Sequence, residues 1–312
     1  MNHLKRIPAS AWLLVIALVW TYFPALTQLL NKYLNDPQYS HGILVPFFAL
    51  FLWMRRPIDA TAAVKPWPIV GGTLLVGALS MHLLATAISF LTLNALSILL
   101  SVLALIMIYR GKSGIRQSWP ALIFLLFMVP MPYQSERILG AELQNIGTIC
   151  TTLLLQCFGQ PAIRDGNLIL IGEVRLGVVE ACSGLRMMVT FAAFCVAAVL
   201  VLERHWVHKL LILLSCVPIA LLVNILRITA TGLCHIWLKD SASKTKVMDF
   251  LHDFNGWMMM PVGLAFLLLE LWVLKHLLVE KPVKATPIQR DTNEQRRPLH
   301  RGPSILLSRS AS

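Results

Sequence analysis

The fold class of this chain is indicated most clearly by residues 210–228, LLILLSCVPIALLVNILRI. A helix that crosses a bilayer needs roughly 20 apolar residues, and this run predicts such a helix over about 209–228. Arg227 is the only charged side chain in the quoted run, and Asn224 lies three residues earlier, on the same helical face. An ionised group inside a span is costly and usually marks a functional site. Near a helix end, however, an arginine could also extend its head group to the interface, so position alone leaves both interpretations open.

The composition of the remaining chain agrees with a membrane protein. Of 312 residues, 57% are hydrophobic and 13% charged, whereas soluble domains are about 45–50% apolar and about 25% charged. We therefore expect an all-α polytopic membrane protein with a single transmembrane domain, residues 1–278, and a basic, disordered cytoplasmic tail, residues 279–312. The amphipathic segment 134–158 is expected to form an interfacial or re-entrant helix. Eight spans are predicted, at about 10–30, 42–54, 68–86, 89–109, 117–133, 185–202, 209–228 and 256–275.

Basic residues predict the orientation of these spans. With a cytoplasmic N-terminus, the inner connections and the tail hold most of the 27 Lys and Arg residues, which is the positive-inside pattern. Both termini are then cytoplasmic. The formal charge of +12 belongs to this topology, so we expect membrane lipid as a partner and no nucleic acid.

Four polar clusters fall on the opposite, extracytoplasmic side of this topology. Each comes from a different connection, so only the fold could bring them together. No set of His, Cys or Asp residues has metal-ligand spacing, and we expect no metal and no other cofactor. The clusters are Glu180, Cys182, Ser183 and Arg186; Asn224 and Arg227; Asp249, His252, Asp253 and Asn255; and the stretch DPQYSHG (36–42), which contains Tyr39 and His41.

Cys182 is the candidate nucleophile. It lies just before the span expected at 185–202, where unpaired backbone N–H groups and the helix dipole favour a thiolate. Arg186 adds positive charge one turn later, and Gly184 lets the backbone approach a substrate closely. A lone membrane cysteine is more often a packing residue, but its polar neighbours favour a reactive thiol.

His252 is the candidate acid or base, because histidine titrates near neutral pH. Asp249, three residues earlier, could orient it. Taken alone, a histidine in a loop or helix start is most often a solvated surface group. His41 is a second candidate base, and Cys234 and His235 stay open.

A β-hairpin is predicted directly before the cysteine. NLILIG (167–172) and VRLGVVE (174–180) are short runs rich in β-branched residues around a Gly-Glu pair. An extended edge beside a nucleophile could hold a substrate peptide by strand addition, or the hairpin could be a small cap with no binding role.

Together, EACSGLR (180–186), NILRI (224–228) and HDFNG (252–256) resemble the exosortase/archaeosortase family. QYSHGILVP (38–46) and VPMP (129–132) are similar to that family's upstream signatures. The resemblance covers about residues 10–275. It implies a cysteine peptidase or transpeptidase of the bacterial inner membrane, which would cut membrane-anchored proteins at a C-terminal sorting signal of the PEP-CTERM kind.

By the same resemblance, Cys182, Arg227 and His252 would form the catalytic trio. From their places in the polar clusters, we expect substrate-binding or supporting roles for Glu180, Ser183, Arg186, Asn224, Tyr39 and His41. Two alternatives remain open. One is a lipid-dependent cysteine acyltransferase, which would release lipid and leave the target protein uncut. The other is a transporter or assembly component for exopolysaccharide, in which Arg227 would bind an anionic substrate.

Overall fold

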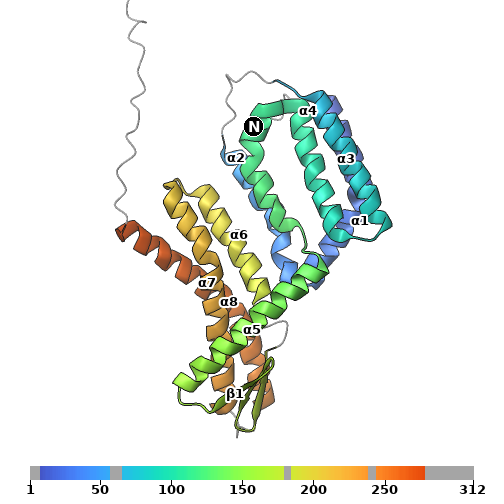
Figure 1. Cartoon of the computed structure of the whole chain (residues 1–312). Coiled ribbons are helices and arrows are strands. Elements are labelled where there is room, and N and C mark those ends of the chain that lie inside the picture. Colours follow the sequence, from blue (N-terminus) through green and yellow to red (C-terminus); the bar gives the residue numbers. More distant parts are fainter. Residues whose placement is uncertain (1–7, 57–64, 179–183, 238–243, 278–312) are drawn as a thin grey trace, which may run out of the picture.

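The helices of this chain form two groups joined by a long oblique helix (Figure 1). The structure is a computed structural model that describes residues 8–56, 65–178, 184–237 and 244–277. Its helices are α1 (Ala9–Asn35), η2 (Pro37–Ile43), α2 (Val45–Arg55), α3 (Pro68–Ala87), α4 (Leu91–Leu125), η3 (Leu126–Met128), α5 (Tyr133–Cys157), α6 (Leu185–Val201), α7 (Trp206–Trp237) and α8 (Lys244–Leu277).

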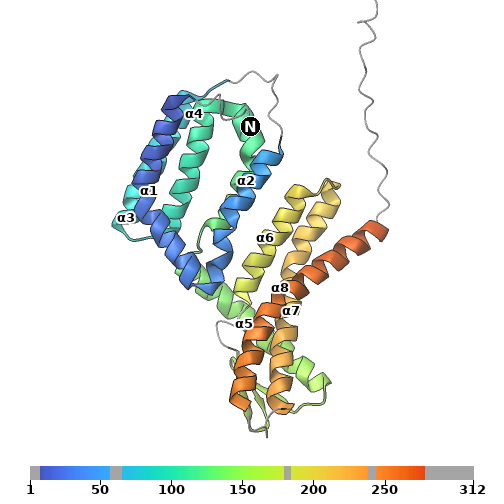
Figure 2. The same ribbon diagram turned by 180° about the vertical axis from the view of Figure 1, so that it is seen from behind.

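Helix α6 links the two groups through its two faces. Helices α1 to α4 form the first group, whose core includes Leu29 and Phe124, and Leu200 of α6 packs against it. Helices α6, α7 and α8 form the second group around buried Phe191 and Ile212. Figure 2, the view from behind, shows the same division, with α5 passing below α1 to α4 and crossing α7 and α8.

Five of the described helical segments are long and apolar enough to cross a membrane. The structure therefore supports a polytopic membrane protein, but it does not confirm the eight predicted spans. Two of the expected spans, for instance, are short helices: α2 has 11 residues and α6 has 17. The five segments are Ala9–Asn35, Pro68–Ala87, Leu91–Met128, Tyr133–Cys157 and Trp206–Trp237.

The segment Leu91–Met128 contains a break at Gly111. There φ is 54° and ψ is −140°, which is not helical. Figure 1 shows the chain turning back near the middle of α4, so two helices follow each other in opposite directions. This reversal agrees with separate predictions for 89–109 and 117–133. The amphipathic segment 134–158, in contrast, forms one continuous helix, α5, which runs obliquely across the molecule.

A three-stranded antiparallel sheet follows α5 and lies near the far end of α7 (Figure 1). Strands β2 (Leu168–Ile171) and β3 (Val174–Gly177) form the predicted hairpin, and Gly172 in its turn has φ 59°. Strand β1 (Ala162–Asp165) was not predicted. Its Asp-Gly-Asn turn, with Gly166 at φ 58°, is a hairpin signal that identifies it in retrospect. Ile169 and Leu176 attach the sheet to α5 and α7 through a shared core.

We predict that Gly111→Ala destabilises the fold. A Cβ atom at this position would lie 1.9 Å from the Lys65 carbonyl oxygen, at a φ that L residues rarely adopt. The backbone strain alone costs about 1–3 kcal/mol, so the apparent melting temperature of the detergent-solubilised protein should fall. Gly72→Ala in α3 is the control, because nothing lies within 4 Å of its Cβ position. Equal melting temperatures for the two variants would contradict the account.

Candidate active site

The start of α6 and the second half of α7 meet at Gly184 and Asn224. Gly184 is the N-cap of α6 and has left-handed geometry, with φ 79° and ψ −4°. A Cβ atom on Gly184 would lie 2.8 Å from Asn224 Nδ2 and 3.0 Å from Asn224 Cγ. Only glycine fits both the conformation and the space. Two sequence motifs that lie some forty residues apart, EACSGLR and NILRI, are therefore in direct contact.

The charged residues of these two motifs lie close to that contact along the chain. Asn224 is 1% exposed, and Arg227 follows it by one turn of α7, where it is half-buried. Arg186 lies in the first turn of α6 and is also half-buried. Arg227, three residues after Asn224, thus lies on the same side of α7 as the residue that packs against the α6 start.

The chain just before the predicted nucleophile is fixed as well. Gln144 of α5 donates a side-chain hydrogen bond to the Val178 carbonyl, and the Val178 N–H donates to the Asn167 carbonyl at 3.0 Å. Val178 itself is buried. The predicted residues Glu180, Cys182 and Ser183 lie outside the described residues, between Val178 and Gly184.

Helix α5 forms another wall beside Asn224. The Cβ position of Gly147 lies 3.8 Å from Asn224 Nδ2 and 3.6 Å from Ile228 Cδ1, which is ordinary van der Waals contact. Because Gly147 has no side chain, α5 packs closely against α7 at this level. Helices α5, α6 and α7 therefore converge on Asn224.

The QYSHG stretch reaches α6 through His41. Its Nδ1 lies 3.4 Å from Thr190 Oγ1, and Thr190 donates at 2.9 Å to the Arg186 carbonyl one turn earlier. Burial lowers the pKa of His41, and main-chain groups of Phe127 and Gln38 oppose that shift. At neutral pH the imidazole is therefore uncharged, as a general base must be before it accepts a proton.

Tyr39 connects the same stretch to the start of α5. Its hydroxyl donates to Glu136 Oε2 at 3.1 Å and accepts from the Met131 N–H at 3.2 Å. Burial and then the charge of Glu136 raise the pKa of Tyr39 to about 12, so the hydroxyl stays protonated at neutral pH. The upstream stretches QYSHG and VPMP are thereby joined by one side chain.

His252 lies within α8, not in a loop or at a helix start. Helix α8 begins at Lys244, eight residues before His252. The predicted start of this helix, at residue 256, was therefore wrong. The described half of α8 packs on both neighbours. Gly263 has its Cβ position 3.0 Å from Met187 Cε of α6, and Glu270 accepts a hydrogen bond from Ser215 of α7 at 2.6 Å. The side chains of Asp249, His252, Asp253 and Asn255 are outside the described part.

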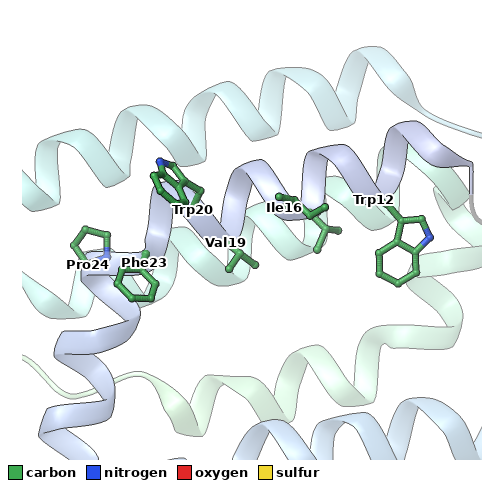
Figure 3. Close-up of a pocket in the computed structure, with 7 residues that line it drawn as sticks. Trp12, Ile16, Val19, Trp20, Phe23 and Pro24 are labelled. Carbon is green, nitrogen blue, oxygen red and sulfur yellow. The ribbon is translucent and has the colours of Figure 1, made fainter.

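An apolar pocket on α1 is separate from these polar residues. All the residues that line it belong to α1, which bends near Pro24 because proline cannot complete the helical hydrogen bonds (Figure 3). Trp12, Ile16 and Phe23 in this lining are exposed apolar side chains, as expected of a helix that faces lipid. Among the described residues, no cluster of His, Cys, Asp or Glu could hold a metal ion.

Three residues of this region were not singled out from the sequence. Gln144 and Glu136 lie in the amphipathic segment, whose many polar residues did not distinguish them from their neighbours. No sequence pattern marked Thr190 as a site residue, because a threonine in an apolar span usually bonds to its own helix. Only the packing of η2 on α6 shows its contact with His41.

The fold and these contacts define a class: a polytopic membrane protein whose polar residues gather where the start of α6 packs against α5 and α7. A comparison with protein families gives the particular family. The transmembrane exosortase family matches residues 33–269. The chain belongs to the transmembrane exosortase family. No curated protein and no solved structure matches it.

We predict that Gly184→Ala impairs function while the protein still inserts in the membrane. The added Cβ would force the α6 start away from Asn224, so the two motifs would no longer fit together. If this chain acts on a partner protein, the rate at which the variant processes that protein in membranes should fall at least tenfold. Gly147→Ala is the matched control, because its Cβ makes only ordinary contacts. Similar loss in both variants would contradict a special role for the Gly184 contact.

Proposed function

We propose that this chain is a cysteine peptidase or transpeptidase of the bacterial inner membrane that cuts the C-terminal sorting signal of exported, membrane-anchored proteins. Its active site would face away from the cytoplasm. The observation that carries the proposal is the contact between Gly184 and Asn224, because it joins the two motifs that hold the predicted nucleophile and the predicted arginine.

Covalent geometry supports Cys182 as the nucleophile. Only Ser183 lies between Cys182 and Gly184, so the Cα atoms of Cys182 and Gly184 are at most about 7 Å apart. Arg186 and the N–H groups at the start of α6 supply positive potential to that neighbourhood. Such surroundings favour the thiolate, which is the reactive form of cysteine.

Arg227 suits the stabilisation of negative charge in the transition state. It is a permanently charged group on a membrane helix, half-buried, and one turn from Asn224. Attack on a peptide carbonyl develops an oxyanion, and one such stabilising group is worth about 10²–10³ in rate. The guanidinium could also orient the substrate main chain through its planar array of donors.

His252 is the proposed acid and base. The Cys182 sulfur attacks the scissile carbonyl carbon, and the C–N bond then breaks while the imidazolium gives its proton to the leaving amine. This leaves a thioester on Cys182 and a neutral imidazole. The imidazole next takes a proton from water or an acceptor amine, which attacks the thioester carbonyl and releases the thiolate.

The direct test is co-expression with a membrane-anchored protein that ends in a Pro-Glu-Pro-like motif, an apolar span and arginines. We predict that Cys182→Ala abolishes cleavage, measured as the shift of that protein to its shorter form. Cys234→Ala is the control, because it removes the other cysteine that the sequence left as a candidate. Cleavage by Cys182→Ala would exclude Cys182 as the nucleophile.

The arginine is tested in the same assay. Arg227→Lys keeps the charge and removes the planar array of donors, so cleavage should fall by about 10²-fold. Arg186→Lys should have a smaller effect, because Arg186 is proposed to act mainly through its charge. Near-normal cleavage by Arg227→Lys would exclude a geometric role for the guanidinium.

A further inference from the structure

Strand β3 is one of the two edge strands of the sheet, and its main-chain N–H and C=O groups point alternately toward β2 and away from it. The strand order is β1-β2-β3, so within the part of the chain that the structure describes β3 pairs with β2 alone. The bond from the Val178 N–H to the Asn167 carbonyl continues the register that pairs Leu176 with Ile169. The main-chain groups of Leu176 and Val178 therefore point toward β2. Those of the alternate residues, Arg175 and Gly177, point to the open edge.

This edge is accessible while the strand itself is held in place. Arg175 and Gly177 are exposed, whereas Leu176 between them is 8% exposed and reaches α7, where its Cδ2 lies 3.2 Å from the Cβ position of Gly232. Leu176 thus attaches β3 to the helices through one face. A fixed strand with outward main-chain groups is the template to which extended peptides add.

We propose that the open edge of β3 binds an extended segment of the substrate polypeptide by main-chain hydrogen bonds and leads it to the nucleophile. The proposal rests on the proposed function, and it adds the way in which the substrate is held. Gly177 has no side chain to obstruct an incoming strand. It is followed by buried Val178 and then by the segment that contains Cys182.

The position of β3 limits where on the substrate the contact falls. Cys182 is five residues beyond Gly177, a separation of at most about 17 Å. A substrate strand that pairs with β3 therefore has its scissile bond within about five residues of the paired segment. The sheet lies beside the end of α7 and the start of α8 (Figure 2), and α8 is the helix to which His252 belongs.

Charge favours an acidic side chain in the bound segment. Arg175 is exposed, and within the described residues it forms no ion pair. An opposite charge across from it on the added strand would form a favourable cross-strand pair. The partner is thus an extended polypeptide segment with an acidic residue close to its cleavage site.

Proline at position 177 tests the main-chain contact. Gly177→Pro removes an outward N–H and leaves the bonds to β2 in place, because edge strands tolerate proline where the N–H faces outward. In membranes with the full chain and the co-expressed sorting-signal protein, the substrate level for half-maximal cleavage should rise about tenfold, with the maximal rate changed less than about threefold. Gly177→Ala keeps the N–H, and its Cβ would lie 3.5 Å from Leu168 Cδ2, so it should resemble the unaltered chain. Equal values for the two variants would overturn the proposal.

Photo-crosslinking gives an answer that depends on neither the proline variant nor cleavage. A benzophenone amino acid at position 175, in a Cys182→Ala chain, should crosslink the intact sorting-signal protein within about five residues of the cut site. Absence of that crosslink, while the unaltered chain cleaves, would overturn the β3 proposal alone. Cleavage by the Cys182→Ala chain would instead refute the proposed function, whatever the crosslink shows.

Removing the charge on each side of the proposed pair tests the role of Arg175. Replacing the acidic residue of the test protein with glutamine should weaken cleavage about threefold in the unaltered chain, as loss of one cross-strand pair predicts, and much less in Arg175→Ala. Equal weakening in both chains would remove Arg175 from the recognition of the substrate.

Discussion

The close packing of Gly184 against Asn224 is the constraint on which the rest of the site depends. A left-handed glycine ends one motif, and a buried asparagine side chain occupies the space where any larger residue would place its Cβ. Around that contact, α5 approaches through Gly147, and Gln144 holds Val178 on the other side of the cysteine-containing segment. The residues on the two sides of the segment that contains Cys182, Val178 and Gly184, are therefore held by contacts with α5 and α7.

Membrane energetics explain why these polar groups gather where the start of α6 packs against α5 and α7. A charged side chain is expensive in the hydrocarbon region, and a loop in lipid leaves backbone groups without partners. Arg227 lies ten residues before the end of α7 at Trp237, so the helix expected to end near 228 continues past it, and Arg186 lies at the start of α6. Tyr39, His41 and Glu136 lie in η2 and the first turn of α5, which border the same region. A peptide cut at this level would have its scissile bond next to its own membrane span.

The sequence predicted the membrane class, the break near residue 111, the hairpin before the cysteine and the start of α6, because apolar periodicity, basic connections and turn residues are local signals. It did not predict that α8 begins at Lys244, since its first turns are polar and resemble a loop. It also could not predict the contacts of His41 with Thr190, or of Tyr39 with Glu136. Those contacts depend on how η2 packs against α6 and α5, which no local pattern encodes. The predicted roles of Cys182 and His252 remain predictions.

Trapping the acyl-enzyme tests the central claim most directly. The full chain, mixed with a sorting-signal protein in membranes and quenched in acid, would be digested and analysed by mass spectrometry for an adduct on each cysteine. The account predicts that the new C-terminus of the cut protein is attached to Cys182 and is released by hydroxylamine, as a thioester is. Cleavage that proceeds with no adduct on Cys182, or with the adduct on Cys234, would contradict it.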